Sequence, residues 1–516
     1  MDSLQRKAAQ VVFPRLGSNM PPPVRVEEDA DRFRQLHAKY QFGGLVLFNG
    51  HKDYTPQILS DLQRISDTPL LVASDIERGT GQQMEGATLF PHAMACGRAG
   101  DEAVATFARV TAQEALACGI HITFAPVADV NSNPRNPIIG IRAFGTQSDA
   151  VSRHVATFIE TCKEEGLLTT AKHFPGHGDT ETDSHAEMPV VTNSLEAFSK
   201  TERPPFQKAI ATSSDLIMTA HLAFPALDPL ERPATLSPVI LQKLLREELG
   251  FKGAIVSDSL IMKAIQPTDG NMARYAANLL NAGLDILLDP LDPVKMVKGI
   301  IQAVETGLLS EQRLDEAISR IQVLRKTLSD RFGATIFEDP ARTQPANIVG
   351  SPQNLQSARR VAGQAIEITR GASTFGHTKS GLPKLAVFIT PYKTRLDPTR
   401  APIEAALETH IDQLTYAEVD ATSDDETLNH IKQIASEVAE VLAIVVSKPA
   451  AWHKYGLPDR LSEFVSQLTT SNKTTLVSLG DPHVLERYPN AVCTICTYSD
   501  VPASQQALVQ FLLNHA

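Results

Sequence analysis

One pattern of hydrophobic and polar positions repeats along the first three fifths of the chain. Between residues 10 and 290, short apolar runs alternate with polar breaks and with segments of helical period. Runs of about four to eight residues without polar alternation are typical of strands buried on both faces, as in a parallel sheet. The eight runs are QVVFPRL, GGLVLFNG, PLLVASD, HITFAPVADV, LLTTAKHF, DLIMTAH, GAIVSDS and DILLDP.

The segments between these runs are candidate helices. Several of them finish at a glycine, for example Gly119, Gly250 and Gly283, as the C-termini of helices often do. Eight strand–helix units fit a closed barrel better than an open sheet. The pattern therefore predicts an α/β protein with a (β/α)8 TIM-type catalytic barrel over residues 1–335.

The pattern changes after the last of these helices. The stretch FEDPARTQPANIVGSPQN is rich in Pro, Asn and Gln, which predicts a linker over residues 336–355. Beyond it, five more apolar runs alternate with amphipathic helices, and this predicts an α/β sandwich domain over residues 356–516. No GxGxxG or GxxxxGK[ST] loop is present, so we expect no nucleotide site and no other cofactor.

Polar side chains stand where five of the first eight runs end. In a barrel the C-terminal ends of the strands converge on one mouth, where active sites lie. A lone Asp at such a place is as easily a helix N-cap, but a Lys and two His among them favour an enzyme site. The residues are Asp75, Asp129, Lys172 with His173, His221 and Asp258. Two alternatives stay open: His221 as a core histidine, and Asp129 as support for a loop.

The densest group of titratable side chains is AKHFPGHGDTETDSHAEMP, residues 171–189. Its His and Asp residues suit a metal, but the chain has no H-E-x-x-H helix, and the Pro and Gly residues break regular ligand geometry. The other interpretation is acid–base chemistry. Asp183 and His185 are two residues apart, so in an extended loop they point the same way. The carboxylate would then orient the imidazole and raise its pKa.

KHFPGHGDTETDSH resembles the K-H-F-P-G-H-G-D-T-x-x-D-S-H motif of glycoside hydrolase family 3, in its bacterial β-N-acetylhexosaminidase branch. FAPVADV, NPIIGIRAFG and SDSLIM follow the family's order along the chain. The resemblance covers the whole predicted barrel and weakens in the C-terminal part. It implies a retaining exo-glycosidase that releases terminal β-linked N-acetylglucosamine through a covalent glycosyl-aspartate intermediate.

The same resemblance implies roles for individual residues. Asp258, in SDSLIM, would be the nucleophile, and His185 would be the general acid/base, oriented by Asp183. No metal is implied. The substrate-binding residues expected from the motifs, with His221 added for its position, are Asp75, Arg142, Lys172, His173 and His221.

One departure from the family bears on specificity. Relatives of cell-wall recycling read D-x-E-G-G-R-V-Q-R, whereas this chain reads DIERGTGQQ, with Gln83 where the second arginine would fall. A glutamine lacks the charge and the rigid donor fork of arginine, so the natural aglycone and the 2-position preference stay open. A β-glucosidase or a β-glycosyl phosphorylase is the alternative within the family. A metal-dependent barrel hydrolase is the alternative from another class.

Phosphorolysis has a physical motive in the predicted acid/base. A histidine places less negative charge near the incoming nucleophile than a glutamate would. Inorganic phosphate could therefore compete with water for the intermediate.

Charge and cysteine content limit the partners and the compartment. The chain has 516 residues and a formal net charge of −11, which argues against nucleic-acid or anionic-membrane binding. Five cysteines in so long a chain indicate a reducing compartment. In CTIC, Cys493 and Cys496 would point to opposite faces of a strand, so we expect no zinc or redox site there.

The hydropathy of the chain completes this picture. Neither a signal-peptide core at the N-terminus nor a run of about 18 apolar residues is visible. We therefore expect a soluble, cytoplasmic protein that acts on a small carbohydrate, with no nucleic-acid or membrane partner. The sequence leaves the oligomeric state open.

Overall fold

The structure is a computed structural model. It describes residues 3–180, 188–267, 269–338, 346–373, 375, 382–392, 400–449, 456–471 and 473–514. The chain divides into two compact units. The first comprises Met1–Leu89, Val104–Ile139 and Ala143–Asn354, and the second comprises Phe90–Ala103, Gly140–Arg142 and Leu355–Ala516. The prediction, which divides the chain at residues 336–355, assigned Phe90–Ala103 and Gly140–Arg142 to the catalytic barrel. The predicted domain boundaries stay a prediction.

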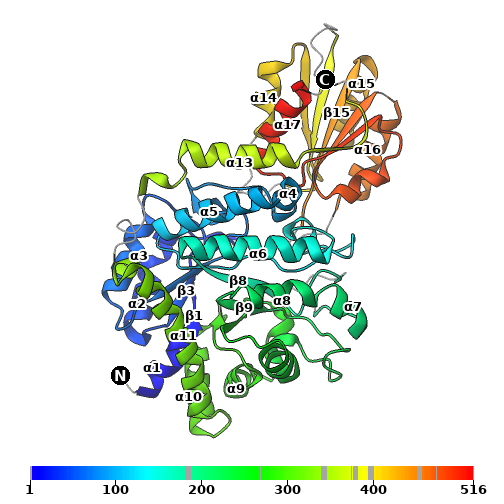
Figure 1. The fold of residues 1–516 in the computed structure, drawn as a ribbon. Coiled ribbons are helices and arrows are strands. Elements are labelled where there is room, and N and C mark those ends of the chain that lie inside the picture. The colour runs from blue at the N-terminus through cyan, green and yellow to red at the C-terminus, as the bar shows by residue number, and fades with distance from the viewer. Residues whose placement is uncertain are drawn as a thin grey trace. The chain divides into compact units, whose positions relative to one another are not determined.

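A parallel sheet forms the centre of the first unit (Figure 1). Its seven strands, counted among the described residues, run from one edge to the other as β10 (Ala254–Ser257), β9 (Leu216–Thr219), β8 (Leu168–Phe174), β7 (Ile122–Thr123), β5 (Leu71–Ser74), β3 (Gly44–Leu47) and β2 (Arg15–Leu16). The residues of β3, β5, β8, β9 and β10 are buried throughout, as the continuous apolar runs predicted.

Two short strands link the ends of this sheet. β1 (Val12–Phe13) pairs in parallel with β11 (Leu287–Leu288), and only Pro14 separates β1 from β2. Ile286, just before β11, bridges Val256 of β10 and accepts a hydrogen bond from the N–H of Ser257. The sheet is therefore curled. The first of the eight predicted runs contains both β1 and β2, and each of the others contains one strand of the curled sheet or β11. The predicted α/β fold is therefore confirmed at this level.

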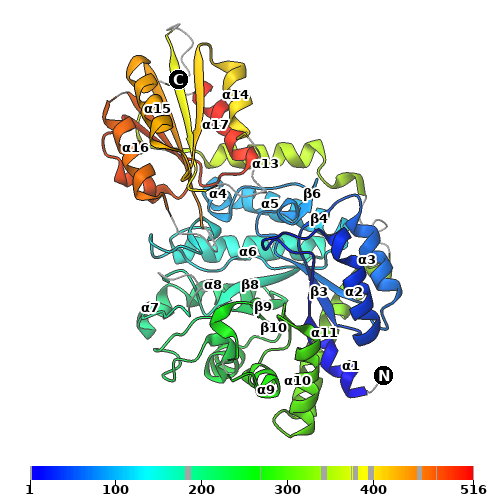
Figure 2. The same cartoon turned by 180° about the vertical axis from the view of Figure 1, so that it is seen from behind.

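Helices accompany the strands as predicted (Figures 1 and 2). Gly283 caps α9, with its N–H directed to Leu279 and Leu280, and Gly166 ends α6 in a left-handed conformation. The helices of the first unit are α1 (Ser3–Gln10), α2 (Val26–Tyr40), α3 (Thr55–Arg64), α5 (Asp101–Ala117), α6 (Ser148–Glu165), α7 (Leu195–Lys200), α8 (Arg203–Ala211), η4 (Val239–Glu248), α9 (Met272–Ala282), α10 (Pro293–Glu305), α11 (Glu311–Phe332) and α12 (Thr335–Glu338).

A buried carboxylate holds the end of the first unit. Glu114 of α5 accepts hydrogen bonds from the N–H and the hydroxyl of Thr88, at 2.7 and 2.6 Å. It also accepts from the N–H of Gly350 and the side-chain amide of Asn354, at 2.9 and 2.8 Å. Gly350 and Asn354 belong to the stretch predicted as a linker, and this part of it is bound to α5.

The second unit contains a sheet with the strand order β12-β17-β16-β15-β13-β14 within the described part of the chain. β12 pairs antiparallel with β17, and the other pairs are parallel. The strands are β12 (Glu367–Gly371), β13 (Lys384–Ile389), β14 (Leu414–Val419), β15 (Glu440–Ser447), β16 (Thr474–Gly480) and β17 (Cys493–Cys496). The helices are α4 (Ala93–Ala99), α13 (Pro352–Ala365), α14 (Ile403–His410), α15 (Asp425–Glu437), α16 (Asp459–Ser471) and α17 (Pro502–Asn514).

Alternate residues of this sheet enter two separate cores. Leu385 and Val387 join the cluster that contains residues of α15 and α16. Ala386 and Phe388 join the cluster that contains residues of α14 and α17. Figure 1 shows these helix pairs on opposite sides of β15. Successive side chains of a strand point to opposite faces, so helices cover both faces of the sheet.

The cysteines follow the same alternation. Cys493 lies in one cluster and Cys496 in the other, which confirms that they point to opposite faces of β17. All five cysteines are buried and free.

Among the described helices, none combines the length and the apolar character that crossing a membrane requires. The cytoplasmic location stays a prediction.

Candidate active site

The predicted site residues of the first unit lie at the C-terminal ends of parallel strands. Asp75 directly follows β5, and Asp258 directly follows β10. Lys172 and His173 lie near the C-terminal end of β8, and His221 is two residues beyond β9. Because neighbouring parallel strands end at the same edge of a sheet, these side chains share one edge of the curled sheet.

Asp258 is half-buried and accepts a hydrogen bond from the N–H of Ser259 at 2.7 Å. Burial acts to raise the pKa of Asp258, but the charges of His173 and His221, this N–H and the charge of Lys172 outweigh it and hold that pKa below its ordinary value. A carboxylate is a nucleophile only when it is ionised. The environment of Asp258 therefore favours its ionised form.

Asp129 holds two histidines of the predicted catalytic loop. Its Oδ2 lies 2.6 Å from Nδ1 of His173, and its Oδ1 accepts from the N–H of His177 at 2.7 Å. Burial acts to raise the pKa of Asp129, but His173 and His177 outweigh it and lower that pKa. An ionised Asp129 accepts a hydrogen bond from the Nδ1–H group of His173, which fixes the orientation of that imidazole.

Lys172 is buried between two carboxylates. Its Nζ lies 2.5 Å from Oδ1 of Asp75 and 2.5 Å from Oε1 of Glu77. The side chains of Lys172 and Glu77 are 2% and 8% exposed, whereas that of Asp75 is 35% exposed. The ammonium group therefore fixes Asp75 from the protein side, and the accessible part of Asp75 can accept hydrogen bonds from a ligand.

Gln83 supports the same turn. Its Nε2 donates to the backbone carbonyl of Asp75 at 3.2 Å, and its Oε1 accepts from the side chain of Asn19 at 2.7 Å. The buried Gln83 therefore fixes the backbone of the turn that carries Asp75.

His221 braces the segment that follows Asp258. Its Nε2 lies 3.1 Å from the carbonyl oxygen of Ser259, and its Nδ1 lies 2.7 Å from the hydroxyl of Thr235. Nε2 therefore carries a proton, because a carbonyl oxygen only accepts. Both ring nitrogens are engaged within the protein, which favours the alternative of a satisfied histidine. A direct contact of His221 with substrate stays a prediction.

Three predicted residues are not tested by this geometry. Arg142 is half-buried and belongs to the second unit, in the short helix η2 (Gly140–Arg142). Asp183 and His185 lie outside the described residues. The substrate-binding role of Arg142 and the acid–base roles of Asp183 and His185 therefore stay predictions.

The start of the 171–189 loop is fastened to the segment after β7. An added Cβ on Gly178 would lie 1.7 Å from the carbonyl oxygen of Val130, so only glycine fits there. Asn136 donates from Nδ2 to the carbonyl of His177 at 2.8 Å, and Nδ1 of His177 lies 2.7 Å from the hydroxyl of Thr180. Up to Thr180 the loop thus has a fixed course.

Sequence reasoning missed Glu77 and undervalued Asp129. Glu77 stands two residues after Asp75 in SDIERG. That spacing would place both carboxylates on one side of an extended segment and could have revealed a shared cation.

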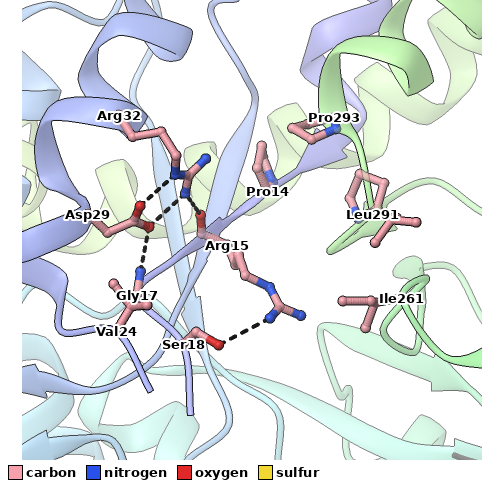
Figure 3. Close-up of a pocket in the computed structure, with 11 residues that line it drawn as sticks. Pro14, Arg15, Gly17, Ser18, Val24, Asp29, Arg32, Ile261, Leu291 and Pro293 are labelled. Carbon is pink, nitrogen blue, oxygen red and sulfur yellow. Dashed lines mark hydrogen bonds and ion pairs between the residues drawn. The ribbon is translucent and has the colours of Figure 1, made fainter. Parts of the chain in front are cut away.

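A pocket of about 250 Å³ adjoins the segment after Asp258 (Figure 3). Asp289 accepts from Nε of Arg15 and from the hydroxyl of Ser259, both at 2.6 Å. Arg32 pairs with Asp29 and donates to the backbone carbonyl of Arg15, as Figure 3 shows. Both guanidinium groups are thus paired with carboxylates. Apart from Gly17 and the polar Ser18, the remaining walls are apolar and are formed by Pro14, Val24, Ile261, Pro290, Leu291 and Pro293.

The described residues contain no group of three or more His, Cys, Asp or Glu side chains placed to hold a metal ion.

Comparison with known proteins identifies the family. The model of the glycosyl hydrolase family 3 N-terminal domain matches residues 3–324. Beta-hexosaminidase A of Pseudoalteromonas piscicida is 34% identical over 351 residues, which are 61% of this chain and 58% of that protein. The beta-N-acetylglucosaminidase/beta-glucosidase of Cellulomonas fimi is 31% identical over 350 residues, 65% of this chain and 60% of that protein. The chain thus matches about three fifths of the length of these two relatives.

A solved structure extends the similarity to the whole chain. The glycoside hydrolase family 3 beta-N-acetylglucosaminidase of Paenibacillus sp. str. FPU-7 superposes with a TM-score of 0.87 at 27% identity, covering 100% of this chain and 97% of that one. The family model alone covers more than half of the residues. The chain therefore belongs to glycosyl hydrolase family 3.

Proposed function

We propose that the chain is a retaining exo-glycosidase that releases terminal β-linked N-acetylglucosamine, with Asp258 as the nucleophile. One observation carries the proposal. Asp258 follows β10 at the edge of the sheet where Lys172 and His173 lie near the end of β8. The charges of Lys172, His173 and His221 lower the pKa of Asp258. The names of the two curated relatives and of the solved structure favour an N-acetylhexosamine at the cleaved end.

The proposal includes the finer description of the fold. Eight strand segments, linked in a ring through β11 and β1, support a (β/α)8 barrel. The C-terminal ends of such a barrel form one mouth, and this is where Asp75, His173 and Asp258 would meet a sugar ring.

The reaction follows from these placements. The carboxylate of Asp258 attacks the anomeric carbon, and the bond to the leaving oxygen breaks as that oxygen takes a proton. We assign this proton to His185, oriented by Asp183. Water then gives a proton back to His185 and cleaves the ester, so the sugar leaves with retained configuration. Asp75, held by Lys172, and His173, held by Asp129, would bind the sugar hydroxyls.

Trapping of the intermediate tests the nucleophile. An activated 2-deoxy-2-fluoroglycoside slows the breakdown of a glycosyl ester, so digestion and mass spectrometry should find the sugar on the peptide with Asp258. Asp258→Asn should abolish both labelling and turnover. Asp269→Asn, at an exposed aspartate further along the same segment, is the matched control and should keep both. A label on any other residue contradicts the assignment.

A substrate panel separates the alternatives within the family. Aryl β-glycosides with and without the 2-acetamido group should differ by on the order of 100-fold in kcat/KM in favour of the acetamido sugar, a difference of about 3 kcal/mol in transition-state binding. A preference for glucosides would make the chain a β-glucosidase. Formation of sugar 1-phosphate in phosphate buffer would make it a phosphorylase. Loss of activity in a chelator would favour the metal-dependent alternative.

A further inference from the structure

Glu202, directly before α8, is a buried carboxyl group outside the proposed reaction. The residue is 1% exposed. Its Oε1 accepts a hydrogen bond from Nδ2 of Asn193 at 3.1 Å. Its Oε2 is buried and has no hydrogen-bond partner among the described residues. A buried carboxylate oxygen without a donor is costly, so the site favours a neutral carboxylic acid.

The side chain of Glu202 contacts the chain on both sides of residues 177–192, the segment that contains the predicted acid–base residues. On the entry side, an added Cβ on Gly176 would lie 2.6 Å from Cγ of Glu202, so the stem of Glu202 packs directly on that glycine. The N–H of Gly176 donates to the carbonyl of His173 at 2.8 Å. On the exit side, Asn193 stands just before the N-cap Ser194 of α7. One side chain therefore fastens the chain on either side of residues 177–192.

The charges around Glu202 oppose its ionisation. Asp179 lies in the loop and Asp129 lies beyond β7, and both raise the pKa of Glu202. Arg203, its neighbour in α8, is the cation next to it in the chain. Burial is the largest cause, the hydrogen bond from Asn193 acts in the opposite direction, and the pKa of Glu202 is raised to about 7. Ionisation would add a third negative charge next to those of Asp179 and Asp129.

We propose that Glu202 is a positioning residue of the glycosidase, which in its neutral form holds the entry and the exit of residues 177–192 in the active arrangement. Its ionisation sets a negative charge against those of Asp179 and Asp129 and displaces the entry, while the hydrogen bond from Asn193 is kept. The inference rests on the proposed function, because the same loop carries the predicted acid–base residues. It adds a group that acts through the loop and does not touch the sugar.

The pH profile of variants tests this role. Glu202→Gln keeps the shape and the acceptor for Asn193 but cannot ionise. In the wild-type protein kcat/KM should fall above about pH 7, and in Glu202→Gln the alkaline limb should move up by at least one pH unit. Glu202→Ala should lower kcat at least tenfold at every pH, because it removes the contacts with both ends. An unmoved limb in Glu202→Gln overturns the proposal.

Asp215→Asn is the matched control. Asp215 is a half-buried residue whose carboxyl pKa is also raised by burial, to about 6, but it accepts a hydrogen bond from the N–H of Thr169 at the opposite end of the strands. Its substitution should leave the alkaline limb in place. A limb that moves equally in Asp215→Asn would assign the effect to general stability and contradict the role of Glu202.

Limited proteolysis gives a readout that needs no substrate. Between pH 6 and 8.5 the wild-type protein should become at least fivefold more susceptible to cleavage within residues 177–192, compared with Glu202→Gln at each pH. Equal cleavage of the two proteins at all pH values rejects the loop role. If the pH-dependent cleavage is present while no glycoside is hydrolysed, the proposed function fails and the positioning of the loop stands.

Discussion

The imidazole of His173 donates from Nδ1 to Oδ2 of Asp129 over 2.6 Å. The backbone N–H groups of His173 and His177 donate to the same carboxylate. Asp129 comes from the segment after β7, whereas His173 lies in β8 and His177 follows that strand. One buried anion thus couples two neighbouring strand ends and sets the position of an imidazole at the edge that holds Asp258.

Asp129→Asn should weaken both folding and catalysis. The amide of asparagine keeps one acceptor oxygen but lacks the negative charge that attracts His173 and His177. We therefore expect a loss of about 2–3 kcal/mol in the free energy of unfolding. A misoriented imidazole should lower kcat/KM at least tenfold. Urea unfolding and kinetics at pH 7 measure both. Unchanged stability and kinetics would contradict the anchoring role.

The pH dependence of that stability has a definite sign. The pKa of Asp129 is lowered in the folded state, so its contribution is complete above the ordinary value of about 3.9 and is lost as the pH falls through the lower folded value. The advantage of the wild-type protein over Asp129→Asn should therefore shrink as the pH falls below about 4. Thermal unfolding across that range measures it, and an advantage that grows in acid would refute the assignment.

Lys172→Met should leave two carboxylates facing each other. Asp75 and Glu77 would lose the cation that lies 2.5 Å from each, and breaking a buried ion pair costs about 3–5 kcal/mol. Chemical denaturation should show this loss. The double variant Lys172→Met with Glu77→Gln removes one of the stranded charges and should recover part of it. A double variant that is less stable than Lys172→Met would show that Glu77 does not oppose Asp75.

Gly178→Ala should disrupt the start of the catalytic loop. Its Cβ would lie 1.7 Å from the carbonyl oxygen of Val130, whereas a Cβ on Gly145 meets nothing within 4 Å. We expect Gly178→Ala to lower kcat at least 100-fold, about 3 kcal/mol, because the backbone must move. Gly145→Ala, the matched control, should change kcat less than twofold. Steady-state kinetics on an aryl glycoside measures kcat of both variants. An equal change of kcat in the two variants would contradict the prediction.

Gln83→Ala should act on substrate binding more than on chemistry. Loss of the bridge between Asn19 and the carbonyl of Asp75 frees the turn that presents Asp75, so KM should rise about three- to tenfold, or roughly 1 kcal/mol. Asn19→Ala should give a similar change, and the double variant should add little. A fall in kcat without a change in KM would assign Gln83 a different role.

The sequence predicted the elements better than the contacts between them. Strands buried on both faces leave continuous apolar runs, so all eight runs of the first unit were visible in the primary structure. Asp258, Lys172 and His173 could be selected because each stands where such a run ends. The family motif added the acid–base pair, which lies outside the described residues.

The buried carboxylates could not be predicted in the same way. Asp129 meets His173 across 44 positions of the chain, and Glu114 meets Asn354 across 240. Pairing over such separations depends on how strands and helices pack, and burial of a single Glu leaves no periodic signal. The edge strand β12 was also missed, because its residues are half-exposed or exposed and form no apolar run.

The cluster around Glu114 determines where the first unit can be separated from the rest of the chain. A fragment ending at residue 335 would keep Glu114 and Thr88 but lose the donors from Gly350 and Asn354. It would carry an anion in its interior with half of its hydrogen bonds missing, at a cost of about 1–3 kcal/mol for each lost donor. An autonomous catalytic fragment therefore has to extend through Asn354.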